Sequence, residues 1–376
     1  MPDRQPSSFP TVQPGLSHAS QDLSVRHSDL QHDNDLTIFS TGGTGYIGGS
    51  VLHTIATSHP DWSITVLLRR VPSNFTSNYP NINIVQGDYD SEHTITKAAE
   101  EATIVVHCGD SDHEASLNAI ITGLLRRATP GCLIHLSGTG IVSDWASPDF
   151  LGRLSPKVWS DDSSKDLEEI RSLPPTALHR NTETILHSSI ANHADKINIA
   201  IMCPPDIYGR GKGLAKTHSA LIPLFIKESK ALGRVFYYNE GTNTRSWVHI
   251  DDLMRVYLRV VEAAASSNPE ATKLYFGENG YHFAATQEHS HIDVATAVGK
   301  LLVEQGVIQD PEPVQVDLER LDAMANIPNF PKLARYLYAS NSRTRAERAG
   351  RLWGYKGEAP GLMEGLESDV LDALRA

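Results

Sequence analysis

The strongest constraint on the fold is a series of short apolar runs, separated by stretches with helical spacing. The first six are Leu36–Phe39, Ser63–Leu68, Ile82–Val85, Thr103–His107, Gly131–Leu136 and Ile197–Cys203. Strands that are apolar along their whole length are typical of a parallel sheet covered by helices on both faces. The sequence therefore predicts an α/β fold: a Rossmann-like, doubly wound parallel sheet followed by a smaller C-terminal lobe.

A glycine turn follows the first apolar run. Gly42, Gly45 and Gly48 recur at every third residue, and a helical pattern begins there. Glycine lets the backbone turn tightly and approach a pyrophosphate, while the N-terminus of the next helix supplies N–H donors. The strand before the turn and the helix after it favour a dinucleotide site over a purely structural turn. The expected contacts come from Gly42, Thr44, Gly45, Tyr46, Ile47 and Gly48.

The second apolar run ends in arginine instead of an acidic residue. A ribose with a free 2′-hydroxyl is usually held by a carboxylate at this position, and a 2′-phosphate by arginine. Because Arg69 and Arg70 stand there, we expect NADP(H) in preference to NAD(H). The alternative is that both arginines only solvate a loop. Asp88, after the third run, is expected near the adenine.

Charge and cysteine content narrow the class of partner. The chain has 33 Lys and Arg against 45 Asp and Glu, a net charge of −12 with histidine neutral, which argues against nucleic acid or an anionic membrane. No apolar run is long enough for a membrane span, and no signal-peptide pattern begins the chain. Cys108, Cys132 and Cys203 lie in apolar stretches, as buried thiols do in a reducing compartment. We expect a cytoplasmic protein with a small-molecule substrate.

The chain divides into three parts. Residues 1–34 hold few large apolar residues and are predicted to be a disordered tail. Residues 35–210 form the predicted NAD(P)-binding core, and residues 211–376 mainly a substrate-binding lobe, with 234–265 returning to the core. A strand is expected over Leu274–Phe276. The apolar face of a helix near 251–265 fits either the core or the pairing of two such helices, which leaves a homodimer open.

Together these motifs resemble the extended short-chain dehydrogenase/reductase superfamily, of the NAD-dependent epimerase/dehydratase type. The resemblance covers about residues 35–375 and rests on the glycine turn, Gly87-Asp88, His107-Cys108-Gly109, His135–Gly138, Cys203–Gly209 and Arg245–Leu253. Residues 138–140, 179–180 and 209–213 are similar to a fungal group of NAD(P)-binding proteins often placed beside biosynthetic enzymes. The resemblance adds Cys108, Gly109 and Pro204 to the expected cofactor contacts.

The chain departs from this superfamily where the chemistry is expected. That chemistry uses a serine or threonine, a tyrosine, and a lysine four residues after the tyrosine on one helix. Counting back from Glu183 puts His179 at the lysine position and Pro175 at the tyrosine position, and Gly138 stands at the serine position. The prolines at 174 and 175 also predict that this stretch is not helical. The standard pair of tyrosine and lysine is therefore absent.

Replacement candidates follow the same strands. His179 can transfer a proton near neutral pH, and Arg180 beside it can hold an anionic or enolic oxygen. Ser137 and Thr139 end the fifth strand and Tyr208 follows the sixth, so their hydroxyls are expected at a cleft, or else bonded to local groups.

Three cations are candidates for a substrate phosphate or carboxylate. They are Arg210, Lys212 and Arg245, and the resemblance puts Arg245 where sugar-nucleotide relatives hold a diphosphate. The alternative for all three is a solvated surface charge. No metal site is expected, and Ser290, between two histidines, is predicted to be a helix N-cap.

The leading hypothesis is an NADP(H)-dependent oxidoreductase, a carbonyl or enone reductase that acts on a small metabolite, in keeping with secondary metabolism, through a non-standard proton donor. The absence of tyrosine and lysine favours a second hypothesis: a non-redox isomerase, cyclase or lyase, similar to epimerases and dehydratases, with a structural dinucleotide. A third is a binding protein that senses NADP. The amount of product formed per NADPH oxidised distinguishes them.

Overall fold

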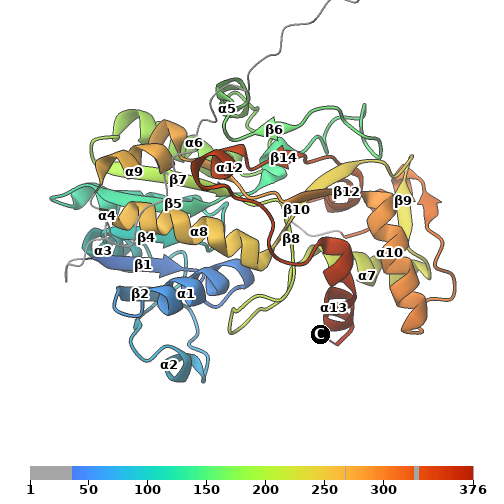
Figure 1. The fold of residues 1–376 in the computed structure, drawn as a ribbon, viewed down its shortest axis with the longest axis horizontal. Coiled ribbons are helices and arrows are strands. Elements are labelled where there is room, and N and C mark those ends of the chain that lie inside the picture. The colour runs from blue at the N-terminus through green and yellow to red at the C-terminus, as the bar shows by residue number, and fades with distance from the viewer. Residues whose placement is uncertain (1–35, 267, 326–329, 376) are drawn as a thin grey trace, which may run out of the picture.

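A seven-stranded parallel sheet forms the centre of the part that the computed structural model describes, residues 36–266, 268–325 and 330–375 (Figure 1). The strand order is β11-β7-β5-β4-β1-β2-β3, and every neighbouring pair is parallel. The strands are β1 (Thr37–Thr41), β2 (Ser63–Leu68), β3 (Asn83–Gln86), β4 (Ile104–His107), β5 (Gly131–Leu136), β7 (Ile197–Cys203) and β11 (Tyr281–Phe283). The predicted Rossmann-like α/β fold is confirmed. The tail predicted over 1–34 lies outside the described residues.

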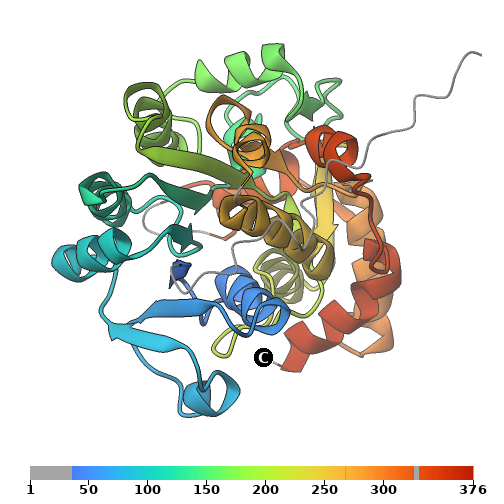
Figure 2. The ribbon, with the colours of Figure 1, turned by 60° about the vertical axis from the view of Figure 1, so that its left-hand side comes forward.

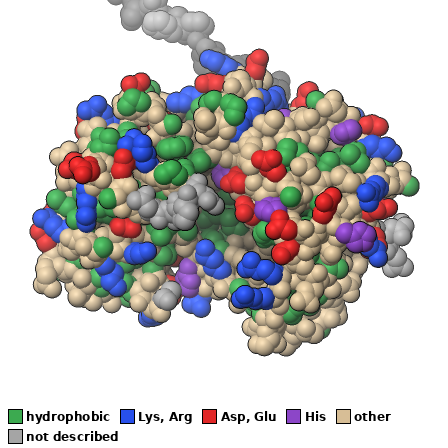
Figure 3. Space-filling view, turned by 180° about the vertical axis from the view of Figure 1, so that it is seen from behind, with side chains coloured by type: hydrophobic (Ala, Val, Ile, Leu, Met, Phe, Trp, Pro, Cys, Tyr) green, Lys and Arg blue, Asp and Glu red, His purple; other side chains and the backbone are tan. Residues whose placement is uncertain are grey.

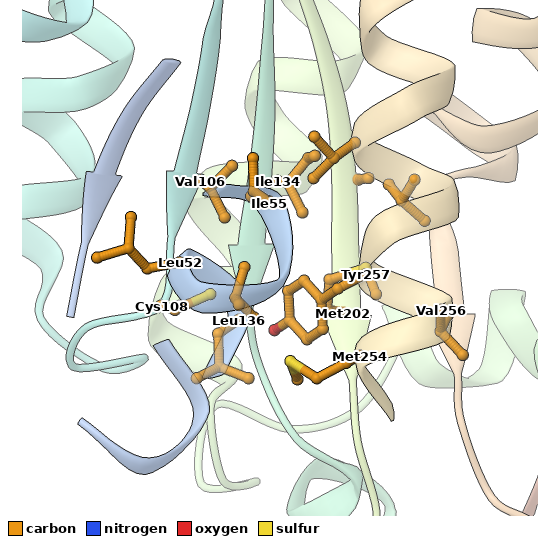
Figure 4. Packing of buried hydrophobic residues seen from close by; sticks show 14 of the residues in the cluster. Leu52, Ile55, Val106, Cys108, Ile134, Leu136, Met202, Met254, Val256 and Tyr257 are labelled. Atoms are coloured by element: carbon orange, nitrogen blue, oxygen red, sulfur yellow. The ribbon is translucent and has the colours of Figure 1, made fainter. Parts of the chain in front are cut away.

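Helices cover both faces of this sheet (Figures 1 and 2). One face carries α1 (Tyr46–Ser58) and α8 (Ile250–Ala265), and the other carries α3 (Glu92–Glu101), α4 (Glu114–Arg126) and α6 (Arg180–Asn192). Figure 4 shows the first face, where α1 and α8 pack on the strands through Leu52, Ile55, Val106, Ile134, Met202, Met254 and Tyr257. These side chains are all buried, which explains why the strands are apolar along their whole length.

The seventh strand comes from far along the chain. The prediction of a strand over Leu274–Phe276 is wrong, because these residues end the helix α9 (Pro269–Tyr275) and the short η3 turn (Gly277–Asn279) follows. Asn268 caps this helix by accepting a hydrogen bond from the Glu270 N–H, and Pro269 stands in its first turn, where proline is favoured. The chain then enters the sheet as β11, with Tyr281 opposite Ile201.

The remaining chain builds a second, smaller body beside the sheet. Its strands are β8 (Asp206–Tyr208), β10 (Thr244–His249) and β12 (Gln287–Ser290) in one sheet, and β9 (Phe236–Tyr238) with β13 (Val314–Val316) in another. Helices α7 (Leu221–Leu232), α10 (His291–Glu304) and α13 (Leu362–Arg375) enclose its apolar core. Ser290 caps α10, as predicted. Within residues 234–265, α8 packs on the central sheet, whereas β9 packs in the apolar core of the second body. The domain boundary at residue 210 stays a prediction.

The remaining helices, turns and strands are short, with at most eight residues each. They are α2 (Phe75–Asn78), η2 (Thr139–Val142), β6 (Trp159–Ser160), α5 (Ser164–Arg171), α11 (Leu318–Asp322), the π-helical turn η4 (Arg335–Ala339), β14 (Thr344–Arg345) and α12 (Glu347–Trp353). The last of these packs beside β11, so the C-terminal part of the chain contacts the outer strand of the central sheet.

Candidate functional site

A cavity of about 520 Å³ lies at the carboxyl ends of β1, β4 and β5. Ligands of open α/β sheets bind at this edge. The core side is lined by Gly42, Thr44, Gly45, Tyr46, Ile47, Gly48, Tyr89, Cys108, Gly109 and Leu136, and the other side by Pro205, Asp206, Ile207, Lys216, Ser219, Ala220, Leu221 and Leu337. The face turned away in Figure 1 is hollowed near its middle, with apolar side chains at the bottom of the hollow (Figure 3).

The glycine turn requires glycine at two of its positions. Gly42 has φ 74°, and a Cβ there would stand 2.2 Å from the carbonyl oxygen of Cys108. A Cβ on Gly48 would stand 2.5 Å from the carbonyl oxygen of Gly42. No side chain caps the N-terminus of α1, where Gly45 is the N-cap residue. The first N–H groups of this helix are therefore available to an anion in the cavity.

A glycine-rich loop over 209–217 packs on α1 and the glycine turn. A Cβ on Gly213 would stand 2.0 Å from the carbonyl oxygen of Gly45, so the two backbones touch. The Lys212 N–H donates to Ser50 Oγ (2.9 Å), and the Lys216 N–H donates to the Thr44 carbonyl (3.2 Å).

This loop brings Lys216 to the cavity, and neither Arg210 nor Lys212 lines it. Arg210 is largely exposed and pairs with Asp372 of α13. Lys216 is not among the site residues predicted from the sequence. The signal that could have revealed it is the run of glycines before it, which marks a close approach of two backbones.

The residues predicted to select the cofactor lie at the surface. Arg69 and Arg70 are exposed at the end of β2, and Asp88 is exposed after β3. The Asp88 carboxylate accepts hydrogen bonds from Ser91 Oγ (2.8 Å) and the Asp90 N–H (3.2 Å), and the bond from Ser91 is the main cause that lowers its pKa. Cys108 and Gly109 line the cavity, whereas Pro205 lines it in place of Pro204.

His179 is held in a defined orientation beyond the end of β5. Its Nδ1 lies 2.9 Å from Asp112 Oδ1, and its backbone has φ 62°, in the left-handed region, at the N-cap of α6. Residues 173–179 are not helical, as predicted from the two prolines. The imidazole Nε2 lies 3.1 Å from the point where a Cβ on Gly138 would stand. The ring therefore occupies space that a serine side chain at position 138 would need.

Tyr336, in the turn η4, completes this corner. Its Oη lies 2.9 Å from the point where a Cβ on Gly140 would stand, and His179 Nε2 lies 3.3 Å from the same point. The phenol ring stacks on the Arg245 guanidinium at 4.7 Å. Burial raises the pKa of Tyr336, and the Arg245 charge opposes that rise. π-Helical turns occur frequently at functional sites. Tyr336 and Asp112 are not among the site residues predicted from the sequence, because they belong to no local motif.

Four other predicted site residues form hydrogen bonds with other groups of the protein. Ser137 Oγ donates to the buried Glu183 carboxylate (2.5 Å), which also accepts from Tyr281 Oη. Thr139 is buried, and its N–H donates to the Pro204 carbonyl.

Tyr208 and Arg180 do not line the cavity, and neither do His179 and Tyr336. Tyr208 is buried between β10 and α13, where its Oη donates to the Pro360 carbonyl (2.8 Å). Arg180 donates to the carbonyls of Leu173 and Arg171.

Arg245 is buried in an ion pair. Its Nε and Nη2 donate to the two carboxylate oxygens of Asp206, and its Nη1 donates to the Tyr336 carbonyl and Ser340 Oγ. The interpretation of Arg245 as a solvated surface charge is therefore wrong.

The described residues hold neither a candidate metal site nor a candidate membrane-spanning helix. No group of three or more His, Cys, Asp or Glu there has an arrangement that could hold a metal ion. None of the helices there is long and apolar enough to cross a membrane.

A family model and several known proteins are similar in sequence to this chain. The model of the NAD dependent epimerase/dehydratase family matches residues 165–274. The oxidase ucsJ of Acremonium sp is 28% identical over 339 residues, which cover 88% of this chain and 95% of that protein. The dTDP-glucose 4,6-dehydratase of Mycobacterium tuberculosis (strain ATCC 25618 / H37Rv) is 23% identical over 245 residues, 60% of this chain and 69% of the relative.

The solved structures similar to this chain have the same fold. That of dTDP-glucose 4,6-dehydratase from Bacillus anthracis str. Ames, in complex with NAD, superposes with a TM-score of 0.60 at 14% identity and covers 90% of this chain and 97% of that one. The predicted resemblance is therefore confirmed: residues 165–274 match the NAD dependent epimerase/dehydratase family, and the chain has the fold of this dehydratase structure.

Proposed function

We propose that this enzyme is an NADP(H)-dependent oxidoreductase that reduces the carbonyl or enone group of a small metabolite, with His179 as the proton donor. The observation that carries the proposal is the position of His179 Nε2, in the space of the superfamily's serine, with the ring fixed by Asp112. A reductase needs a proton donor at this place, and imidazole donates protons near neutral pH.

The cavity has the groups that a dinucleotide needs. The glycine turn and the uncapped N-terminus of α1 would hold the pyrophosphate, and the Lys216 ammonium adds a positive charge beside them. Arg69 and Arg70 would pair with a 2′-phosphate. When bound, the dinucleotide supplies the hydride.

Residues of the protein itself bind the proton and transfer it to the substrate. Asp112 accepts a hydrogen bond from the His179 Nδ1–H, which leaves Nε2 as the nitrogen that faces the substrate oxygen. The carboxylate also stabilises the imidazolium before proton transfer. Tyr336 Oη, at the same glycine corner, is the second hydrogen-bond donor to this oxygen. The His179 side chain is 19% exposed, so solvent can reprotonate it after each turnover.

Substitution of His179 tests the proton donor. We expect His179→Gln to lower kcat by about 10²- to 10⁴-fold, as is typical for loss of a general acid, and to leave NADPH affinity nearly unchanged. The measurement is product formed per NADPH oxidised, with His93→Gln, an exposed histidine on α3, as the matched control. An active His179→Gln variant would reject the residue assignment, and product without NADPH oxidation would reject the reductase.

Substitution of Asp112 tests the positioning of the ring. Its side chain is 48% exposed, so its coupling to His179 falls in the range of exposed pairs, about 0.2–1 kcal/mol. Asp112→Asn should therefore lower kcat only by about two- to fivefold, and at low ionic strength more than at high. A loss as large as that of His179→Gln would show that Asp112 itself takes part in the proton transfer.

Cofactor preference is tested at the end of β2. We expect NADPH to bind more tightly than NADH. The double variant Arg69→Ala with Arg70→Ala should reduce the ratio of NADPH affinity to NADH affinity by about 10- to 100-fold, because charged hydrogen bonds to the 2′-phosphate are lost. Arg126→Ala, an exposed arginine at the end of α4, is the control. Equal affinities for both cofactors in the wild type would refute the preference for NADP(H).

A further inference from the structure

We infer that the substrate is a neutral, largely apolar carbonyl compound, and that the cavity excludes nucleoside diphosphates and similar polyanions as substrates. The inference rests on the proposed function, because it takes the half of the cavity beyond the glycine turn as the substrate site. It follows from where the charges around this cavity lie and what each of them contacts.

The first observation concerns Arg245, the cation that the resemblance assigns to a diphosphate. Its side chain is 6% exposed, and four of its five N–H bonds end on Asp206, the Tyr336 carbonyl and Ser340. Its face is covered by the Tyr336 ring. A phosphate that recruited this guanidinium would leave the largely buried Asp206 carboxylate, which itself lines the cavity, without its counter-charge, and this is strongly unfavourable. Arg245 is therefore a structural cation with no capacity left for a substrate.

The second observation concerns the remaining wall of the substrate half. Five of its lining residues are apolar: Pro205, Ile207, Ala220, Leu221 and Leu337. Leu337 and Leu221 also line a smaller space, so the wall continues into the core of the second body. The other residues around that space are the apolar Phe225, Trp247 and Val294, together with Arg245, His289 and His291. Ligand sites of this composition take apolar ligands and orient them through a few polar groups.

The third observation concerns the cation that does line the cavity. The Lys216 backbone N–H donates to the Thr44 carbonyl, in the glycine turn, so this residue joins the cavity wall at the dinucleotide end. The N-terminus of α1 lies at this same end. Among the lining residues, the features that attract anions therefore lie on the cofactor side. The substrate half is mostly apolar and carries the Asp206 carboxylate and Ser219, so an anion there would lose its hydration without compensation by a cation.

Binding to the full-length protein saturated with NADP⁺ tests this directly. The probes are 4-methylacetophenone and 4-acetylbenzoate, two ketones of the same shape that differ in a methyl group against a carboxylate, together with dTDP and UDP. We expect the neutral ketone to bind at least about tenfold more tightly than the carboxylate in calorimetric titrations, and neither nucleotide to bind at about 1 mM. Nucleotide binding at lower concentration, equal or tighter binding of the carboxylate, or no binding of the neutral ketone would overturn the inference.

This readout is separate from turnover. A protein that binds the neutral ketone without oxidising NADPH would refute the reductase and keep the substrate class. A protein that oxidises NADPH only with the carboxylate would refute the neutral substrate class and keep the reductase.

A cation introduced into the wall should reverse the preference. Leu337→Lys places an unpaired ammonium in the substrate half and is expected to make 4-acetylbenzoate the tighter ligand, by about tenfold or more. Leu154→Lys, in a loop where Leu154 is 50% exposed, is the matched control and should change neither affinity. Where circular dichroism shows that Leu337→Lys is unfolded, Leu221→Lys makes the same test. A folded variant with the wild-type preference would show that this wall does not face the ligand.

Discussion

Restoring a serine at position 138 is expected to lower activity, although the superfamily uses a hydroxyl there. Gly138 has φ −171° and ψ 155°, an extended backbone that any residue adopts, so the substitution strains nothing in the main chain. Its Cβ would stand 3.1 Å from His179 Nε2, closer than ordinary contact, and the ring must move by a few tenths of an ångström. The ring resists this, because Nδ1 is held by Asp112 at 2.9 Å.

The size of the effect follows from this displacement. A misplacement of about 1 Å at a reacting group costs on the order of 10²-fold in rate, so a few tenths should cost about three- to tenfold in Gly138→Ala. Gly138→Ser should lose more, at least about tenfold, because its hydroxyl also competes for the Nε2 hydrogen bond. The assay is kcat/KM for NADPH-dependent reduction, with NADPH affinity and melting temperature measured alongside.

Gly350→Ala is the control for this comparison. Gly350 lies in α12, and the nearest atom to its added Cβ is the Tyr355 carbonyl oxygen at 3.8 Å. This change should leave activity unchanged and stabilise the helix by about 0.5–1 kcal/mol. Wild-type or higher activity in Gly138→Ser would mean that the chemistry needs a hydroxyl at this place, and would refute His179 as the proton donor.

Two further predictions concern stability. Asp206→Asn leaves the buried Arg245 charge unpaired and should lower the free energy of unfolding by about 3–5 kcal/mol; an unchanged midpoint in urea would contradict this. Burial lowers the pKa of His107 and of His282 to about 4, so the unfolded chain binds more protons between pH 6.5 and 4, and stability should fall as the pH drops through this range, by about 3 kcal/mol for each histidine. Burial raises the pKa of Asp161 to about 7, which stabilises the folded chain as the pH drops and opposes the effect of the histidines by a similar amount. Removal of one histidine, in His282→Asn, should therefore reduce the loss of stability between pH 7 and 5 relative to the wild type. An equal loss in both proteins would refute the contribution of His282.

The central sheet could be predicted from the sequence because its strands, except the edge strand β3, are largely buried on both faces. Strands β2, β5 and β7 have the bounds expected from their apolar runs. Strand β11 was missed because it has three residues, with His282 in the middle, too few for a pattern. The apolar run over 274–276 instead predicts a strand, because the helix α9 that it ends is only seven residues long and shows no clear helical period.

The site could be predicted only where it is local in sequence. The glycine turn is a continuous segment, and His179 was found because it stands four residues before Glu183. Its partners Asp112 and Tyr336 are 67 and 157 residues away from it, and only the folded chain brings them together. The engagement of Ser137 could not be foreseen either, because nothing in the sequence indicates that the Glu183 carboxylate is buried against it.

The late position of β11 in the chain has a consequence during synthesis. Strand β7 ends at Cys203, but its outer neighbour is complete only at Phe283, 80 residues later. At about 5–20 residues per second, the edge of β7 stays open on the ribosome for roughly 4 to 16 seconds, with unpaired N–H and C=O groups on an apolar strand. Such non-local pairing also slows folding. Fragments that end before Tyr281 should therefore aggregate, and nascent chains of this enzyme should depend on chaperones until β11 has emerged.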